Sequence, residues 1–168
     1  RDIAIKFNNL YGDIFTIPEP EIPADVAVVP GIDGQKMSKS YNNYIEIFGE
    51  ENVIRKKIMS IVPDSTPVDK PKAPDKCNVF QLYKLFATLA QTKEMAAKYR
   101  QGGYGYGDAK KALFELFWEY FAPYRQKRAE LLKNKKEVVQ ILELGADKAR
   151  AEILKTLQKV RQAVGTAR

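Results

Sequence analysis

Apolar side chains recur at steps of three and four residues at the start of the chain, and this spacing predicts an amphipathic helix over residues 2–11. The stripe consists of Ile3, Phe7, Leu10 and Tyr11. Gly12 follows it and is suited to cap the helix, because glycine readily adopts the left-handed backbone conformation found after many helices. Three prolines between residues 18 and 23 then exclude regular structure.

A compact apolar run, Val26–Val29, predicts a buried strand. It leads into residues 30–43, where glycines, a proline and an aspartate argue against regular structure. Residues 50–61 predict a second helix, because acidic side chains at its start and lysines near its end both favour the helix dipole. Residues 62–77 contain four prolines, which predict a linker.

From Asn78 onward the hydrophobic pattern is helical almost throughout. A first apolar stripe precedes a short helix predicted over residues 93–101. The stripe consists of Val79, Leu82, Tyr83, Phe86, Leu89 and Ala90. Residues 102–107 are rich in glycine and tyrosine, but they lack the spacing of a GxGxxG nucleotide loop, so we interpret them as a connection between helices.

Four polar or helix-breaking residues predict where the last helices begin and end. Asp108 is a candidate N-cap for a helix with a broad apolar face, and Pro123 should kink or restart that helix. Asn134 with Glu137 resembles a capping box. Gly145 is expected to end the helix that follows, which leaves residues 147–164 as a last helix.

Composition narrows the class of protein. The chain has 168 residues, of which 45% are hydrophobic and 29% charged, typical of one sizeable globular domain or two small ones. No apolar run reaches the length of a membrane span, so we expect no membrane partner. A single cysteine, Cys77, fits a reducing cytoplasm, and the lack of histidine argues against a metal site.

The net charge of +7 is unevenly distributed. From Asp108 to the end there are 14 Lys and Arg against 8 acidic residues, whereas the preceding part has 14 against 13. Solvated helix faces and attraction to a phosphate backbone are both consistent with this imbalance.

The loop at residues 30–43 carries the candidate chemistry. It presents Lys36 and Lys39 together with Ser38 and Ser40 on a glycine-rich segment. Ammonium groups neutralise phosphate charge, while hydroxyl and backbone N–H groups donate hydrogen bonds to phosphate oxygens. The loop is therefore suited to bind a polyphosphate.

Residues 36–40 read KMSKS, which resembles the second signature of class I aminoacyl-tRNA synthetases, and the wider run DGQKMSKSYNN resembles the tryptophanyl-tRNA synthetases. The similarity extends along essentially the whole chain. It includes RDIAIKFNNLYG, IPEPEIP, IRKKIMSIVPDS, CNVFQLYKLFATL, GGYGYGDAKKAL and ELGADKAR. The first signature of the class contains histidine, which this chain lacks, and the chain opens within a helical pattern without methionine. We interpret it as a carboxy-terminal fragment that is inactive alone.

The resemblance implies a mainly α fold with three parts. Residues 1–62 would be the carboxy-terminal end of a Rossmann-like α/β catalytic domain with the KMSKS loop, residues 63–77 a linker, and residues 78–168 a helical domain that binds tRNA near the anticodon. The implied enzyme is a cytoplasmic homodimer that activates L-tryptophan with ATP and Mg²⁺, the metal arriving as part of the ATP complex, and then transfers tryptophan to tRNA(Trp).

The resemblance also assigns residue roles. Lys36 and Lys39 would be catalytic, stabilising the leaving pyrophosphate. The residues that would bind ATP are Ala27, Lys36, Met37, Ser38, Lys39 and Ser40. Ala27 would contact adenine through its backbone.

Three alternatives stay open. The chain could be a basic helical module that binds RNA without catalysis, a purely structural helical domain, or a relative of the tyrosyl-tRNA synthetases. The lysine loop after an apolar run favours the enzyme over the RNA-binding module and the structural domain. Many bacterial tyrosyl enzymes vary the lysine motif and carry a different RNA-binding tail, which is not found in this sequence.

Overall fold

The computed structural model describes residues 1–23 and 26–167. The fold is mainly helical, which confirms the predicted class. Within the described ranges the only β pairing is an isolated antiparallel bridge between Pro30 and Lys36. The chain divides into two compact units, one formed by residues 1–22 with 128–168 and the other by residues 23–127.

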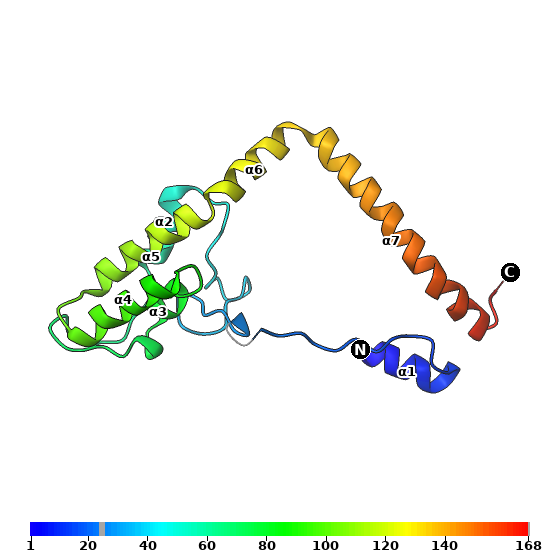
Figure 1. Ribbon diagram of the computed structural model, residues 1–168, viewed down its shortest axis with the longest axis horizontal. Coiled ribbons are helices and arrows are strands. Elements are labelled where there is room, and N and C mark those ends of the chain that lie inside the picture. The colour runs from blue at the N-terminus through cyan, green and yellow to red at the C-terminus, as the bar shows by residue number, and fades with distance from the viewer. Residues whose placement is uncertain (24–25, 168) are drawn as a thin grey trace. The chain divides into compact units, whose positions relative to one another are not determined.

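The larger unit is organised around helix α5 (Tyr106–Tyr120) (Figure 1). Helices α2 (Glu51–Met59) and α3 (Asn78–Tyr83) both pack against α5. Helix α4 (Leu89–Gln101) and the 3₁₀ turn η2 (Pro74–Lys76) pack against α3 and against each other. The fully buried apolar side chains of the described residues all belong to this unit. They are Ile54, Ile58, Ile61, Cys77, Val79, Phe80, Leu82, Tyr83, Met95, Ala96, Tyr99, Ala109, Leu113, Phe114 and Phe117.

A ladder of cations and aromatic rings fixes α2 to α5. The Arg55 guanidinium lies 4.0 Å from the centre of the Phe114 ring, which stacks on the indole of Trp118 with ring centroids 5.9 Å apart. Arg125 covers the other side, 3.5 Å from the Trp118 ring, and donates a hydrogen bond to the Trp118 carbonyl oxygen. These cation–π contacts join α5 to α2 through Arg55 and to the start of helix α6 (Ala122–Lys133) through Arg125.

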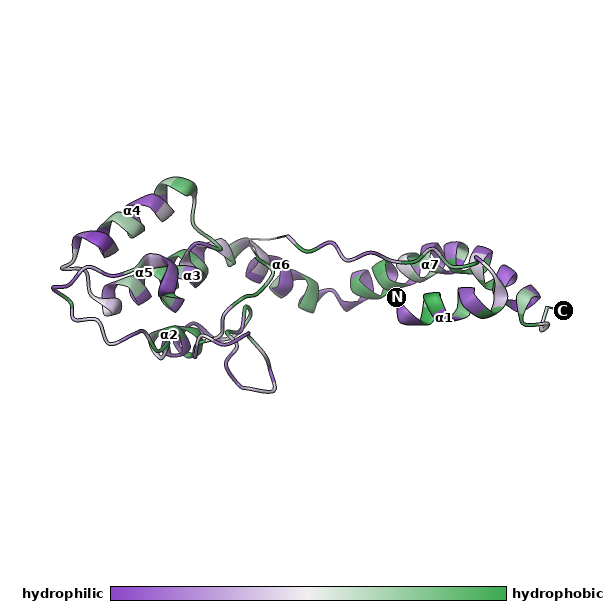
Figure 2. Cartoon of the chain, turned by 90° about the horizontal axis from the view of Figure 1, so that it is seen from below, coloured by the Kyte–Doolittle hydropathy of each residue, from purple (hydrophilic) through white to green (hydrophobic). Residues whose placement is uncertain are grey.

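The smaller unit contains helix α1 (Asp2–Tyr11) and helix α7 (Lys135–Ala163). Gly12 has φ 87° and donates its N–H to the Asn8 carbonyl oxygen, which confirms the predicted cap. Polar and apolar residues alternate along α7, and none of its described side chains is buried (Figure 2). Phe15 and one side of α7 line a groove. The α7 residues of that groove include Ile153, Leu157 and Val160.

Asn134 caps α7 as predicted, but the capping box is incomplete. The Glu137 carboxylate binds the Asn134 side chain, whereas the Asn134 backbone N–H donates to the carbonyl oxygens of Glu130 and Leu131. The Asn134 side-chain oxygen accepts a hydrogen bond from the Glu137 N–H over 3.3 Å, and the Asn134 amide donates to the Glu137 carboxylate over 3.0 Å. The predicted restart at Pro123 is also confirmed, because α5 ends at Tyr120 and α6 begins at Ala122. In the described part of the chain, no helix combines the length and apolar character needed to cross a membrane.

The predicted strand Val26–Val29 is wrong. Val26 has a 3₁₀ conformation, Ala27 and Val28 form a bend, and both valines are largely exposed. A strand needs a neighbour to satisfy its N–H and C=O groups, and the described residues supply only the bridge at Pro30. The apolar run therefore forms an irregular segment.

Two helix starts also differ from the prediction. The first apolar stripe is broken, because α3 ends at Tyr83 and α4 begins at Leu89. Thr88 causes this start, since its hydroxyl accepts a hydrogen bond from the Gln91 N–H while the Gln91 side chain accepts one from the Thr88 N–H. Helix α5 has Gly105 at its N-cap in place of the predicted Asp108, which lies in the first turn.

The helix end predicted at Gly145 is absent. Helix α7 runs without interruption from Lys135 to Ala163. A glycine inside a helix costs only about 1 kcal/mol relative to alanine. The flanking Leu, Glu, Ala and Lys residues are strong helix formers, so a single glycine does not end the helix.

The proline-rich segment of residues 62–77 is packed against the helices. The Lys72 N–H donates to the Tyr99 carbonyl oxygen over 2.8 Å, and the Gly103 N–H donates to the Val68 carbonyl oxygen over 2.8 Å. Pro74 is buried. Because α2 packs on α5, residues on both sides of this segment share one core. The division into residues 1–62, 63–77 and 78–168 stays a prediction about the whole protein.

Candidate functional site

The lysine loop is closed by hydrogen bonds between its two ends. The Met37 N–H donates to the Val29 carbonyl oxygen over 2.9 Å, and the Gly31 N–H donates to the Gln35 carbonyl oxygen over 2.7 Å. Between these contacts the chain turns at Gly34, whose φ of +83° is strained for residues with a side chain. The loop therefore has a defined backbone at the position where the sequence predicted irregular structure.

Asn43 fills the inside of the loop and is only 2% exposed. Its side-chain oxygen accepts a hydrogen bond from the Ser38 N–H over 2.7 Å. Its amide nitrogen donates to the Asp33 carboxylate over 2.9 Å and to the Lys36 carbonyl oxygen over 3.1 Å. The Asn43 backbone carbonyl oxygen accepts from the Ile32 N–H over 2.9 Å. Sequence reasoning missed this residue, because a lone asparagine after a motif carries no signal of burial.

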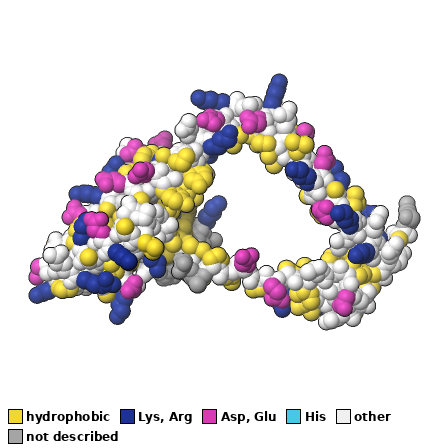
Figure 3. Space-filling view, in the orientation of Figure 1, with side chains coloured by type: hydrophobic (Ala, Val, Ile, Leu, Met, Phe, Trp, Pro, Cys, Tyr) yellow, Lys and Arg dark blue, Asp and Glu magenta, His cyan; other side chains and the backbone are white. Residues whose placement is uncertain are grey.

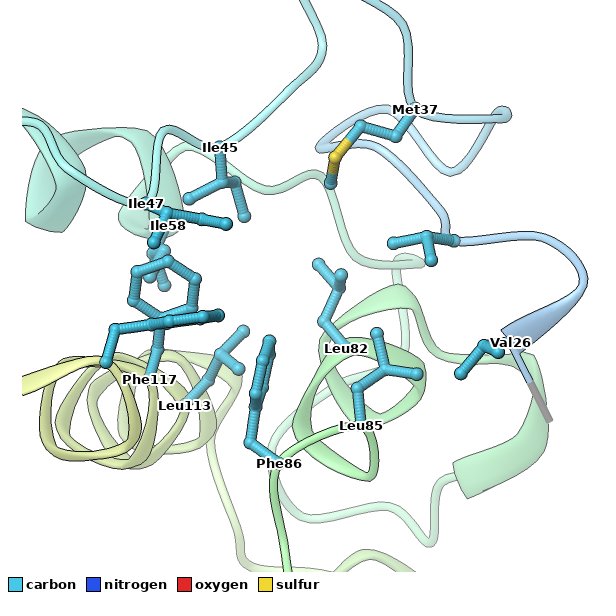
Figure 4. Close-up of a pocket in the computed structure, with 12 residues that line it drawn as sticks. Val26, Met37, Ile45, Ile47, Ile58, Leu82, Leu85, Phe86, Leu113 and Phe117 are labelled. Carbon is cyan, nitrogen blue, oxygen red and sulfur yellow. The ribbon is translucent and has the colours of Figure 1, made fainter. Parts of the chain in front are cut away.

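The Met37 side chain anchors the loop on the helical core. It is half-buried and points into an apolar cavity of about 300 Å³ (Figure 4). The residues that line the cavity come from the loop, α2, α3 and α5 among others. They include Ile45, Ile58, Leu82, Leu113 and Phe117. The neighbouring Lys36 and Lys39 are exposed.

The sequence-predicted site residues lie on one short stretch of loop. Among the residues that the structure describes, no hydrogen bond or ion pair engages the ammonium group of Lys36 or Lys39. Ser38 is half-buried and its hydroxyl oxygen accepts from the Ser40 N–H over 3.2 Å. Ala27 is exposed and lies two residues before Val29, whose carbonyl holds Met37.

A third cation lies at the end of the loop. Lys57, on the last turn of α2, donates to the Asn42 carbonyl oxygen over 2.7 Å. Asn42 has φ 52°, a left-handed conformation that asparagine tolerates better than most residues. Lys57 was expected only to favour the helix dipole, and nothing in the sequence indicates that it fastens the loop to α2.

Basic residues of α7 are interspersed with acidic ones (Figure 3). Arg150 forms an ion pair with Asp147 at 3.2 Å, and Lys155 forms one with Glu152 at 2.8 Å. All four side chains are exposed, and such pairs contribute little to stability. Within the described residues, Lys148 and Lys159 are not part of any ion pair.

The geometry suits binding of an anion with several phosphates. Two ammonium groups without a partner among the described residues lie three residues apart on a loop whose backbone is held by Asn43 and Met37. Exposed cations on a fixed frame neutralise phosphate charge without first breaking protein contacts. The described residues contain no cluster of three or more acidic or cysteine side chains that would hold a metal ion.

Comparisons with known proteins give a consistent result. Residues 1–122 match the family model of tRNA synthetases class I (W and Y). Tryptophan–tRNA ligase from Rhodopirellula baltica is 48% identical over 165 residues, and that from Campylobacter jejuni is 46% identical over 165 residues. Each alignment covers 98% of this chain and 52% of the relative. The chain thus spans about half the length of the curated relatives it matches.

Solved structures give the same picture. The crystal structure of tryptophanyl-tRNA synthetase from Campylobacter jejuni, in complex with ADP and tryptophan, matches with a TM-score of 0.80 at 46% identity. A second structure of tryptophanyl-tRNA synthetase from the same organism matches with a TM-score of 0.78 at 45% identity. Both matches cover 98% of this chain and 52% of the solved chain.

Proposed function

Because the chain belongs to the family of class I tRNA synthetases for tryptophan and tyrosine, we propose that it supplies the phosphate-binding loop and the helical part of a tryptophan–tRNA ligase. The reaction joins tryptophan to ATP with release of pyrophosphate, and then esterifies the terminal adenosine of tRNA(Trp). The identity to ligases of this name, 46–48%, supports tryptophan over tyrosine as the amino acid.

The observation that carries the proposal is the pair of exposed lysines on a fixed loop. When the amino-acid carboxylate attacks the α-phosphorus of ATP, negative charge builds up on the leaving pyrophosphate. A cation held where this charge develops stabilises the transition state more than the ground state. Lys36 and Lys39 fill this role, and Mg²⁺ brought with the ATP shares the phosphate charge.

The other loop residues support nucleotide binding. Ser38 and Ser40 donate hydrogen bonds to phosphate oxygens, Met37 holds the loop on the apolar surface, and the Ala27 backbone contacts adenine. ADP bound to the Campylobacter jejuni enzyme supports a nucleotide site in this family. The loop moves between states that admit ATP and release product, as lids of this kind do.

The helical part binds tRNA in this proposal. Residues 78–168 form the tRNA-binding domain, residues 1–62 complete the Rossmann-like catalytic domain, and residues 63–77 join them. The excess of lysine and arginine after Asp108 supports attraction to a phosphate backbone. We place the whole protein in the cytoplasm, as a homodimer that takes L-tryptophan, ATP and tRNA(Trp).

The test is pyrophosphate exchange by the full-length protein with Lys36→Ala and Lys39→Ala. Each variant should lower the rate of tryptophan activation by about one to three powers of ten, as loss of one charge-stabilising donor does. Lys56→Ala is the matched control, because Lys56 is exposed on α2 and outside the loop. It should exchange pyrophosphate at the wild-type rate.

Unchanged rates in both loop variants would contradict the catalytic role. Binding of tRNA without any tryptophan-dependent exchange would instead support a basic helical module. Exchange that requires tyrosine would assign the protein to the tyrosyl branch of the same family.

A further inference from the structure

We propose that Asn43 is the positioning residue of the phosphate-binding loop, acting on catalysis through the backbone that carries Lys36 and Lys39. The inference rests on the proposed function and adds a residue to the site that the lysine motif does not contain. It starts from the unusual burial of this carboxamide, which is 2% exposed although both lysines and most other polar side chains of the loop are exposed.

Two contacts of Asn43 lie on either side of Met37, between the two lysines. The Asn43 amide nitrogen holds the carbonyl of Lys36 at 3.1 Å, and the Asn43 side-chain oxygen holds the N–H of Ser38 at 2.7 Å. These two groups flank Met37, and Lys39 follows Ser38 directly. One side chain therefore fixes the backbone immediately beside both ammonium-bearing residues.

The same amide also orders the first half of the loop. Its second donor goes to the Asp33 carboxylate at 2.9 Å, and that oxygen accepts the Gln35 N–H at 3.1 Å as well. Through Asp33, Asn43 therefore also stabilises the turn that precedes Lys36. Asn43, the last residue of the loop, thus binds Asp33 near the start of the loop and Lys36 and Ser38 near its middle.

The fit around Asn43 leaves no room for adjustment on the side of Gly31. A Cβ atom at Gly31 would lie 2.5 Å from the Asn43 side chain and 2.7 Å from its carbonyl oxygen. Any side chain at position 31 would therefore displace the Asn43 amide and disturb its three side-chain hydrogen bonds. Glycine at this position is required by the close approach.

The chemistry of the three partners selects a carboxamide. The Ser38 N–H needs an acceptor, whereas the Lys36 carbonyl and the Asp33 carboxylate need donors. Aspartate would keep the acceptor, lose both donors and place a second carboxylate beside Asp33, which is unfavourable. Serine is too short to reach the three partners at once.

Displacement of the lysines by about 1 Å is sufficient to lower a rate by roughly a hundredfold, because charge stabilisation depends on where the charge develops. We therefore expect Asn43→Asp and Asn43→Ser to reduce the kcat of tryptophan activation by about ten- to a hundredfold. The KM for tryptophan should stay at the wild-type value, because the loop binds phosphate and leaves the amino acid to other residues.

The experiment measures pyrophosphate exchange and active-site titration of the full-length protein for wild type, both Asn43 variants and Asn52→Ser. Asn52 is an exposed asparagine on α2 and should behave as wild type. Normalising to titrated active sites removes any loss of folded enzyme. A lower kcat for each active site, with KM for tryptophan unchanged, supports positioning. If the Asn43 variants keep the wild-type kcat for each active site, the positioning role is overturned. The same conclusion follows if Asn52→Ser loses as much kcat as they do.

A double-mutant cycle then tests whether Asn43 acts through the lysines. Asn43→Ser is combined with Lys36→Ala plus Lys39→Ala. If Asn43 positions the ammonium groups, its substitution should cost much less once these groups are gone. Equal costs in the two backgrounds would overturn the inference. If the lysine substitutions alone change nothing, the proposed function fails first, whereas active lysines with a neutral Asn43 refute only this inference.

Discussion

The phenol of Tyr106 donates a hydrogen bond to the Asp64 carboxylate over 2.6 Å, joining the segment after α2 to the first residue of α5. The same carboxylate oxygen accepts the Thr66 N–H over 2.8 Å. Hydrogen bonds from Thr66 and Tyr106 lower the pKa of Asp64 below the usual 3.8. Burial, together with the hydrogen bond to Asp64, raises the pKa of the Tyr106 phenol above 10.0.

The hydrogen bond between Tyr106 and Asp64 predicts that the free energy of unfolding depends on pH in the acidic range. Because the pKa of Asp64 is lower in the folded state, its contribution is complete above 3.8 and is lost as pH falls through the lowered folded value. Asp64→Asn should therefore be less stable than wild type near neutral pH, and the difference should close on acidification. Thermal unfolding of both proteins across the acidic range measures this, with exposed Asp75→Asn as the control. A difference that grows toward low pH would contradict the assignment.

The buried ammonium of Lys72 should contribute to stability. Lys72 is 4% exposed and donates to the carbonyl oxygens of Pro67, Val68 and Lys70 at 3.1, 3.1 and 3.2 Å. Lys72→Met keeps the length of the side chain but removes these bonds, so the free energy of unfolding should fall by about 2 kcal/mol. Lys70→Met, at an exposed position, should change it by less than about 0.5 kcal/mol in urea unfolding. Equal values for the two variants would show that the ammonium is dispensable.

Gly145 offers a prediction of opposite sign. A Cβ at this position meets nothing within 4 Å, and the residue lies inside the continuous helix α7. Gly145→Ala should therefore raise the free energy of unfolding by up to about 1 kcal/mol. Gly12→Ala, at φ +87°, should lower it, because alanine is strained there. If the helix ended at Gly145, as the sequence predicted, the alanine variant would instead bring no gain in stability or helicity measured by circular dichroism.

The cations of α7 that lack an acidic partner in the described residues should carry the tRNA contact. Replacing Lys148, Lys159 and Arg161 by Gln in the full-length protein should weaken tRNA binding and flatten the slope of log affinity against log salt by roughly 2. The control is Gln at Lys56, Lys70 and Lys76, three exposed lysines outside residues 78–168, which removes the same charge. Equal slopes for the two triple variants would mean that tRNA affinity depends only on net charge, and would contradict a specific contact at α7.

The sequence predicted the fold where a local signal and the packing agree. Helix α1 and its cap at Gly12, the N-cap at Asn134 and the restart at Pro123 all depend on neighbours within a few residues. The run at Val26–Val29 failed because a strand is stabilised by pairing with another segment. Hydrophobicity alone does not reveal whether that segment is present.

In the candidate site, too, the sequence predicted some residues and missed others. The lysines were evident from their motif, because their role requires exposure and a fixed spacing. Asn43 and Lys57 were not evident, since each acts by binding the backbone of the loop, and the sequence does not show whether a polar residue is buried or solvated. Their roles follow only from three-dimensional contacts.

The hydrogen bonds of Asp33 also bear on the chemical ageing of the protein. An aspartate followed by glycine cyclises readily to a succinimide and then yields isoaspartate, because glycine leaves the attacking backbone nitrogen unhindered. Here the Asp33 carboxylate accepts two hydrogen bonds, and the Gly34 N–H donates to the Gly31 carbonyl oxygen over 3.1 Å. The Asp33 carboxylate and the Gly34 nitrogen are thus both held in hydrogen bonds, so the folded loop resists succinimide formation at this Asp-Gly sequence. Isoaspartate should accumulate first in chains whose loop has opened.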